Sequence, residues 1–198
     1  RIPIIATHED SLIPGLTLAT ALIRQQSAFG LGQDADGGFV QLGPLRAHTY
    51  PQGNLLLRYR GPSGTFPTYS AVDILSAPLP DLRGRVAIVG PTASGLGDNH
   101  VTPPDRIFPG IEIHATALDN LLQNDALVRP AWGIGAEACS IVVVGILSSL
   151  LMMSAGPLAC ATGLVLGGAG LWFAGLWLLD GPGYWISPLS ATLVLVGN

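Results

Sequence analysis

Residues 133–153 read GIGAEACSIVVVGILSSLLMM, and Glu137 is the only charged residue among them. At roughly 1.5 Å per residue, a helix of this length spans about 30 Å, the thickness of the hydrocarbon core of a bilayer. A second apolar run at residues 158–179 follows the short turn SAGP. The sequence therefore predicts two transmembrane helices, over residues 133–154 and 157–179, joined as an antiparallel hairpin.

A third apolar run follows the turn DGPG at residues 180–183. Tyr184 and Trp185 stand at its start, and Trp132 stands just before the first run. Tryptophan and tyrosine gather at membrane–water interfaces, so these residues indicate where the helices enter and leave the bilayer. We expect residues 184–198 to be the start of a third transmembrane helix, truncated where the sequence ends.

Glu137 lies about one turn inside the first apolar helix. A carboxylate at that depth can reach the interface, so it costs far less than the roughly 2.5–3.5 kcal/mol of a charge at the bilayer centre. We interpret Glu137 as a marker of the membrane boundary and not as an intramembrane functional acid. A buried helical hairpin of a large soluble protein is the alternative, and tandem runs with aromatic residues at their ends favour the membrane.

Residues 1–130 have the composition of a domain that faces water. They contain every arginine, nearly all the acidic residues and all four histidines. The net charge of the chain is -4 and the arginines are scattered singly, so nucleic acid is not an expected partner. Cys139 and Cys160 lie in the apolar runs, where we interpret them as small packing residues.

The polar domain is predicted to contain both strands and helices. Apolar spacing predicts helices at residues 12–26, 69–76 and 109–123, and apolar runs between turn residues predict strands at residues 2–6, 39–42, 45–50, 55–59 and 85–89. Residues 85–89, RVAIV, are typical of a central strand, and the Gly/Asp-rich residues 30–38 are interpreted as a connection. The expected fold class is an α/β sensor domain, a mixed sheet with flanking helices, followed by an all-α transmembrane bundle.

Two loops, residues 60–68 and residues 92–105, carry the polar residues that could bind a ligand, because loops held at the ends of strands are where binding usually resides. The candidate ligand-binding residues are Arg60, Thr65, Thr68, Thr92, Ser94, Asp98, His100 and Thr102. Arg60 could clamp an anionic ligand. The bland interpretation of Arg60 is that a long Pro/Gly loop needs a charged group to keep it solvated.

Patterns for catalysis and cofactor binding fail in detail. The glycine-rich residues 90–98 lack the spacing of nucleotide-binding loops and have no lysine for a phosphate. A hydrolase elbow, Gly-x-Ser-x-Gly, would need glycine at Thr92, two residues before Ser94. Glu112 and His114 are two residues apart, so on a helix they point to different sides and make a poor metal pair. We expect no catalytic residue, no metal and no cofactor.

Four segments of the polar domain together resemble a known family. They are YRGPSGTFPT at residues 59–68, LRGRVAIVG at residues 82–90, GLGD at residues 95–98 with Thr102 and Pro103 after it, and PGIEIHA at residues 109–115 running into LDNLL at residues 118–122. In this order and spacing they are similar to the type 2 CHASE domain, an extracellular sensory module of bacterial receptors, over about residues 12–130. Pro91 and the turn at residues 103–105 depart from the pattern, which affects the details of the loops.

The resemblance implies that residues 1–130 are an extracytoplasmic, periplasmic sensor domain whose first part precedes Arg1. Such domains are normally preceded by one span and followed by three, in the inner or plasma membrane. They feed an adenylate or guanylate cyclase, a histidine or serine/threonine kinase, or a diguanylate cyclase. The partners implied are the lipid bilayer, a small-molecule or physical signal and a second copy in a homodimer. With the domain outside, three spans leave the C-terminus in the cytoplasm.

Three other functions stay open at this point. A membrane-tethered hydrolase would use Ser94, Asp98 and His100 or His114. A permease would need intramembrane polar residues, and Glu137 is the one that the apolar runs offer. A module that only dimerises the receptor would bind no small molecule.

Overall fold

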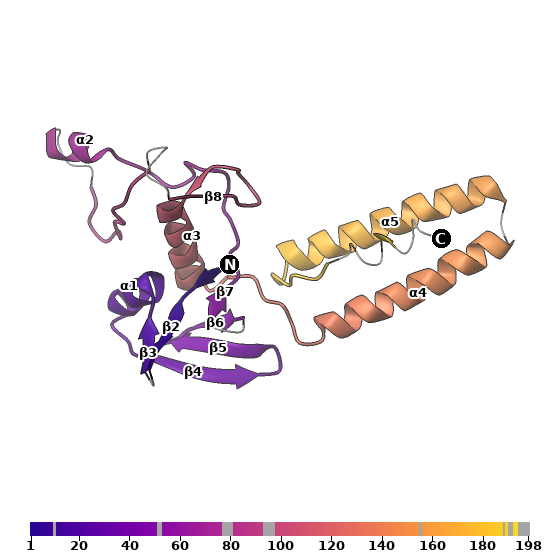
Figure 1. The fold of residues 1–198 in the computed structure, drawn as a ribbon, viewed down its shortest axis with the longest axis horizontal. Helices are drawn as coiled ribbons and strands as arrows, with labels where there is room; N and C mark the ends of the chain where they lie inside the picture. The colour runs from indigo at the N-terminus through magenta and orange to yellow at the C-terminus, as the bar shows by residue number, and fades with distance from the viewer. Residues whose placement is uncertain are drawn as a thin grey trace. The chain divides into compact units, whose positions relative to one another are not determined.

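The computed structural model describes residues 1–9, 11–50, 53–76, 81–92, 98–154, 156–187, 189 and 192–193 (Figure 1). The chain divides into two compact units. Unit 1 comprises Arg1–Gly30 and Val40–Ala126, and unit 2 comprises Leu31–Phe39 and Leu127–Asn198.

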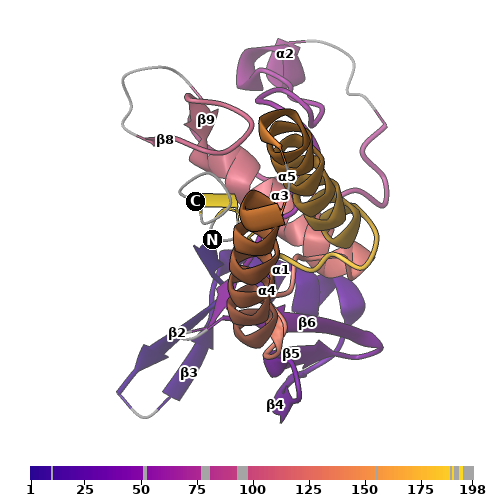
Figure 2. The same ribbon diagram turned by 90° about the vertical axis from the view of Figure 1, so that its right-hand side faces the viewer.

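The described strands form small separate sheets. Three of them are antiparallel pairs: β1 (Ile2–Pro3) with β7 (Asn54–Leu55), β2 (Ile5–His8) with β3 (Ser11–Pro14), and β8 (Asn99–His100) with β9 (Phe108–Pro109). The fourth is a three-stranded sheet in the order β4 (Phe29–Asp34), β5 (Gly37–Leu42), β6 (Leu45–Thr49). Figure 2 shows the β2–β3 and β8–β9 pairs as hairpins. The sheets are flanked by helices, which confirms the expected α/β class.

Three helices belong to unit 1: α1 (Leu16–Gln25), α2 (Ala71–Ser76) and α3 (Gly110–Gln123). The helix predicted at residues 109–123 is confirmed as α3. It ends because Asn124 takes a left-handed conformation, with φ of 56°, and its backbone N–H donates to the carbonyl of Asn120.

The core of unit 1 forms where α1 and α3 pack against the strands. Its fully buried residues are Ile4, between β1 and β2, and residues of both helices, β5 and β7: Leu18, Ala21, Val40, Leu42, Leu55, Ala117 and Leu121. α1 and α3 are amphipathic, with their apolar side chains spaced on one face. The burial of that face holds the first turn of α3 at a fixed place in unit 1.

Two predicted boundaries are wrong because a hairpin uses the residues. The helix predicted from residue 12 begins only at Leu16, since Ser11–Pro14 pair with β2. The connection predicted at residues 30–38 is instead β4, a turn and the start of β5. The turn is shaped by Asp34, Asp36 and Gly37, since the Asp36 N–H donates to Asp34 Oδ1 at 2.9 Å and Gly37 has φ of 120°, whereas Gly30 and Gly32 lie within β4.

The predicted central strand at residues 85–89 is wrong as well. The segment is not a strand in the described part of the chain, and Val89 is 94% exposed. Ile88 packs partly against the core, while the Arg85 N–H donates only to the nearby Leu82 carbonyl. Apolar β-branched residues favour a strand, but a strand also needs a partner edge, and none of the described strands supplies one.

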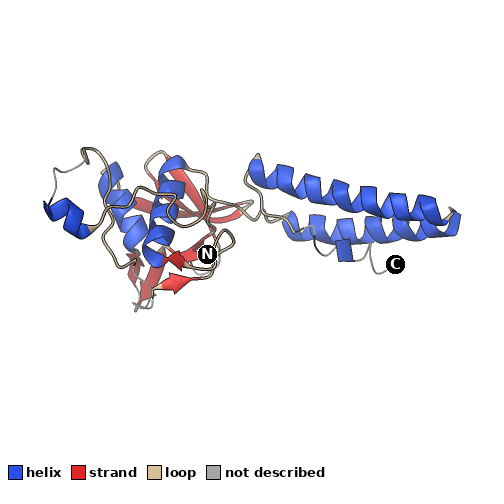
Figure 3. Cartoon of the chain, turned by 90° about the horizontal axis from the view of Figure 1, so that it is seen from above, coloured by secondary structure: helices blue, strands red, loops and turns tan. Residues whose placement is uncertain are grey.

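Unit 2 contains the two long helices α4 (Gly133–Ser154) and α5 (Pro157–Asp180), which lie side by side (Figure 3). Both are long and apolar enough to cross a membrane, with mean hydropathies of 2.0 and 1.6, and at most 6% of either window is buried. They are therefore not core helices of this chain. Gly163 of α5 lies against the Leu151 side chain, where a larger residue would collide.

The expected third span falls mostly outside the described residues. Residues 184–187 are described and are not helical, so a helix does not begin at Tyr184. Of the rest, only residues 189, 192 and 193 are described, and these are helical. Cys160 is half-buried, with its thiol 3.6 Å from the Leu151 carbonyl, in keeping with a packing role, whereas Cys139 is exposed.

Candidate functional site

Asp98, in the second candidate loop, lies against the first turn of α3. The Gly110 N–H donates to the Asp98 carbonyl at 2.8 Å, and the Asp98 carboxylate lies so close to Gly110 that any β-carbon there would collide with both of its oxygens. Asp98 therefore places a negative charge at the positive end of the α3 dipole. His100 Nε2 lies 3.2 Å from Asp98 Oδ1, and both side chains are about half exposed to solvent.

The other candidate loop is held by the same turn of α3. Glu112 is 8% exposed, and its carboxylate accepts hydrogen bonds from the Gly64 N–H at 2.9 Å and from the Ser63 hydroxyl at 3.1 Å. A buried carboxylate needs such partners, because leaving it unpaired costs more than a neutral group would. Glu112 thus fixes the Pro/Gly-rich loop against the helix.

The two loops that the sequence singled out therefore meet at the start of α3. Gly110 binds one loop and Glu112 binds the other. Aromatic packing joins the segments that flank the loops, since the rings of Tyr59 and Phe108 meet edge to face with centroids 5.4 Å apart. Burial raises the pKa of Tyr59 above its ordinary value. The start of α3, with both loops, is the candidate ligand-binding site.

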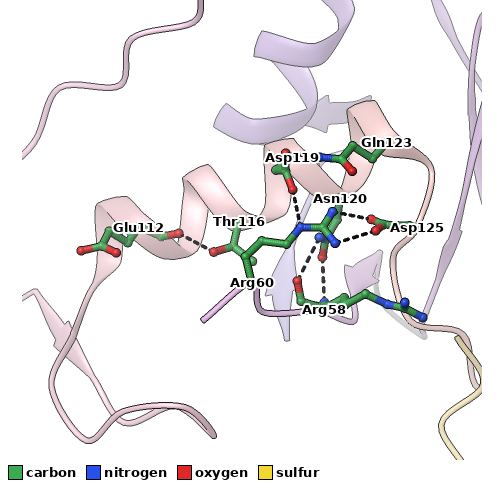
Figure 4. A network of polar contacts seen from close by, with 8 residues as sticks. All are labelled: Arg58, Arg60, Glu112, Thr116, Asp119, Asn120, Gln123 and Asp125. Atoms are coloured by element: carbon green, nitrogen blue, oxygen red, sulfur yellow. Dashed lines mark hydrogen bonds and ion pairs between the residues drawn. The ribbon is translucent and has the colours of Figure 1, made fainter. Parts of the chain in front are cut away.

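Arg60 lies further along α3 and has two carboxylate partners (Figure 4). Its Nε donates to Asp119 Oδ2 at 2.6 Å, and its Nη1 and Nη2 contact Asp125 at 2.7 and 2.9 Å. The hydrogen bond to Asp125, with a smaller contribution from Asp119, raises the pKa of Arg60 above its already high ordinary value. An anionic ligand at Arg60 would have to displace these carboxylates.

Asn120 supports Arg60 by holding the backbone beside it. Its side chain accepts from the Arg58 N–H at 2.7 Å and donates to the Arg58 carbonyl at 3.0 Å (Figure 4). These bonds replace the partner strand that residues 55–59 would need, so β7 ends at Leu55 and the predicted strand is too long. Sequence reasoning missed Asp119, Asn120 and Asp125 as partners; the signal was two acids and an amide in and just after the last turns of α3.

The predicted threonines lie in turns. Their hydroxyl groups donate to nearby carbonyls: Thr65 to Pro62 at 2.6 Å, Thr68 to Phe66 at 3.1 Å and Thr102 to Asp105 at 3.0 Å. Thr92 is exposed, and Ser94 lies outside the described residues. Among the residues that the structure describes, no group of three or more His, Cys, Asp or Glu side chains could hold a metal ion.

A pocket of about 160 Å³ lies between α1, α3 and residues 86–89. Its walls are mostly aliphatic, and its polar groups include Thr17 and His114, whose Oγ1 and Nδ1 atoms are 3.0 Å apart. The imidazole of His114 is thus paired with a buried hydroxyl and not with the Asp98 carboxylate.

Comparison with known proteins gives one family match. The family model described as CHASE2 domain matches residues 1–151, which include unit 1's helices and most of α4. No curated protein and no solved structure matches the chain.

Proposed function

This chain belongs to the CHASE2 domain family, and from that premise we propose that it is the signal-sensing and transmembrane-coupling part of a bacterial membrane receptor. CHASE2 domains are extracellular sensory domains of receptors and are not catalytic, which supports a sensing role for unit 1. In this proposal unit 1 lies in the periplasm, and α4 and α5 cross the inner membrane. The output, a cyclase, a kinase or a diguanylate cyclase, lies beyond the third span in the cytoplasm.

The observation that carries the coupling part of this proposal is the position of α3 in the chain. Its first turn binds both candidate loops, through Gly110 and Glu112. Its last turn leads through residues 124–132 into α4. A signal that moves the loops would therefore act on a helix whose other end continues toward the membrane.

Ligand binding in this proposal uses the exposed polar groups of the two loops. Asp98 and His100 offer a carboxylate and an imidazole 3.2 Å apart at the surface, and Thr92, Ser94 and Thr102 border them in sequence. Arg60 contributes by fixing the start of its loop on α3. A ligand shifts the receptor only by its difference in affinity for two states, and a shift from 1:99 to 99:1 needs about 5.5 kcal/mol.

Two reporter fusions to the parent receptor test the arrangement. A reporter active only outside the cytoplasm is fused into unit 1, and one active only inside is fused after the completed third span. Activity of both is expected. The reverse pattern would put unit 1 in the cytoplasm and overturn the receptor proposal. A homodimer is part of the proposal, and cross-linking of the receptor in membranes reports it.

A further inference from the structure

Unit 2 contains a polar and aromatic cluster at the start of α4 and just after the end of α5. We call it the juxtamembrane cluster, and it consists of Arg129, Trp132, Glu137, Tyr184, Trp185 and Ser187. Glu137 is its centre. Glu137 Oε2 accepts a hydrogen bond from Arg129 Nη2 at 2.9 Å, and Oε1 accepts one from the Ser187 backbone N–H at 2.9 Å.

Backbone hydrogen bonds join the same two segments independently of Glu137. Val128 and Tyr184 form a parallel bridge, in which the Val128 N–H donates to the Gly183 carbonyl at 2.9 Å and the Trp185 N–H donates to the Val128 carbonyl at 2.8 Å. The segment before α4 and the segment after α5 are thus hydrogen-bonded to each other.

Aromatic rings close the cluster. Trp132 and Tyr184 pack edge to face with centroids 5.7 Å apart, and the Arg129 guanidinium lies 5.0 Å from the centre of the Trp185 ring. These contacts hold Arg129 where it meets Glu137. Its side chain is 26% exposed and that of Glu137 is 17% exposed, so the ion pair is partly shielded from water.

A residue that only marks the membrane boundary needs no partner in the protein, because its side chain can reach water. Glu137 instead has each oxygen bound by a different segment of the chain. Charge-assisted bonds of this kind are about twice as strong as neutral ones, and removing one partner of a shielded pair is costly.

We propose that Glu137 is a positioning residue that fastens the segment entering α4 to the segment leaving α5. A displacement of residues 128–132 then moves α4 directly and moves residues 183–187 through the cluster. Without Glu137, the two segments would be linked only by the weaker backbone bridge at Val128 and by the aromatic contacts. This inference rests on the proposed function, in which residues 124–132 carry the signal to the membrane.

Amide hydrogen exchange of the full chain in lipid nanodiscs tests the inference. Glu137→Ala should raise exchange at the amides of Ser187, Trp185 and Val128 by about tenfold or more, and leave amides in the middle of α4 unchanged. The Trp185 amide is the decisive reading, because it donates to Val128 and not to Glu137. A change at Ser187 alone, or at none of the three, would overturn the proposal.

Two further variants keep the test decisive. Ser140→Ala is the matched control, since this hydroxyl on the next turn of α4 donates only to the Glu137 carbonyl, at 2.7 Å, and should change nothing. If Glu137→Ala disturbs the whole hairpin, Glu137→Gln decides: its amide oxygen still accepts from Ser187 but forms no ion pair. Raised exchange at Val128 and Trp185 supports the proposal, and unchanged exchange contradicts it.

Failure of this proposal is distinguishable from failure of the proposed function. Exchange within unit 2 does not depend on which side of the membrane unit 1 occupies, whereas the reporter fusions depend on nothing else. If the reporters are reversed and the exchange is as expected, the receptor proposal is rejected and the proposal that Glu137 fastens α4 to the segment after α5 is retained. Correct reporters with unchanged exchange would remove only the role of Glu137.

Discussion

α3 and α4 each contain a buried or partly buried glutamate near their start, and each glutamate binds a segment from elsewhere in the chain. Glu112 binds Gly64 and Ser63 in unit 1, and Glu137 binds Arg129 and Ser187 in unit 2. The helices around them differ. α3 buries one face in a core, whereas most residues of α4 are exposed and its buried residues are Gly133 and Ser148.

This difference indicates which interactions matter in each unit. In unit 1, apolar contacts supply most of the stability, and Glu112 adds a smaller share while it determines where a loop lies. In the hairpin of unit 2, lipid is as apolar as leucine, so burial adds little and close packing and polar contacts gain weight. The four predictions below test this contrast, beginning with the largest expected effect.

Leu121→Ala in α3 should have the largest effect on stability. Leu121 is 1% exposed in the core, and its truncation leaves a cavity, so the free energy of unfolding of unit 1 should fall by about 2–5 kcal/mol. Leu147→Ala in α4, where the residue is 61% exposed, is the matched control and should cost less than about 1 kcal/mol. Denaturant-dependent hydrogen exchange measures both. Equal losses of unfolding free energy in the two variants would contradict the claim that burial stabilises unit 1 more than the hairpin of unit 2.

Local patterns in the sequence predicted the helices well. α3 begins one residue after the predicted boundary. The prediction is this accurate because its signals, Pro109, Gly110 and the apolar spacing, all lie in the helix or directly before it. The two apolar helices follow directly from composition. By contrast, residues 12–14 were predicted as helix, because their pairing with β2 leaves no local signal. Residues 85–89 were predicted as a strand although the described residues offer no partner edge.

The candidate site was predicted in part. The sequence identified the two loops but not their meeting at α3, since Glu112 and Gly64 are 48 residues apart in the chain. Arg60 was identified as a possible anion clamp, but its carboxylate partners lie 59 and 65 residues away. Hydrogen bonds between distant residues leave no local pattern, so the fold is needed to find them.

Glu112→Ala should have the next largest effect. The change leaves the Gly64 N–H and the Ser63 hydroxyl without their acceptor, so unit 1 should lose about 1.5–3 kcal/mol and the Gly64 amide should exchange faster. Glu112→Gln retains an acceptor and should show a smaller loss. If Glu112→Ala leaves the Gly64 amide as protected as before, the loop is held by other contacts, and Glu112 does not hold a distant segment as Glu137 is proposed to do.

Gly163→Ala tests whether close packing stabilises the hairpin. A β-carbon at Gly163 collides with the Leu151 side chain, so the variant should weaken the α4–α5 pair by about 1 kcal/mol. Gly168→Ala in the same helix is the control, because nothing lies within 4 Å of the added carbon. Trp172 and Trp177 fluorescence during unfolding in mixed micelles reports both variants. Equal effects would mean that the helices do not depend on this contact.

Tyr59→Phe should have the smallest effect at neutral pH and a visible one in alkali. Burial raises the pKa of Tyr59 above 10.0, so the folded state holds the phenol proton more tightly than the unfolded state does. The resulting stabilisation is complete below about pH 10 and is lost as the pH rises through the folded pKa. The phenylalanine variant keeps the edge-to-face contact with Phe108, so its stability at pH 7 should change little.

The alkaline half of the stability curve distinguishes Tyr59 from an exposed tyrosine. Between pH 8 and pH 11, the melting temperature of unit 1 should fall less steeply for Tyr59→Phe than for the unchanged chain. Tyr69→Phe, at a residue that is 50% exposed, should follow the unchanged chain. If the two variants fall alike, Tyr59 is not buried between the loops. The packing of Tyr59 against Phe108 would then not join the loops, and the start of α3 would rely on Glu112 and Gly110 alone.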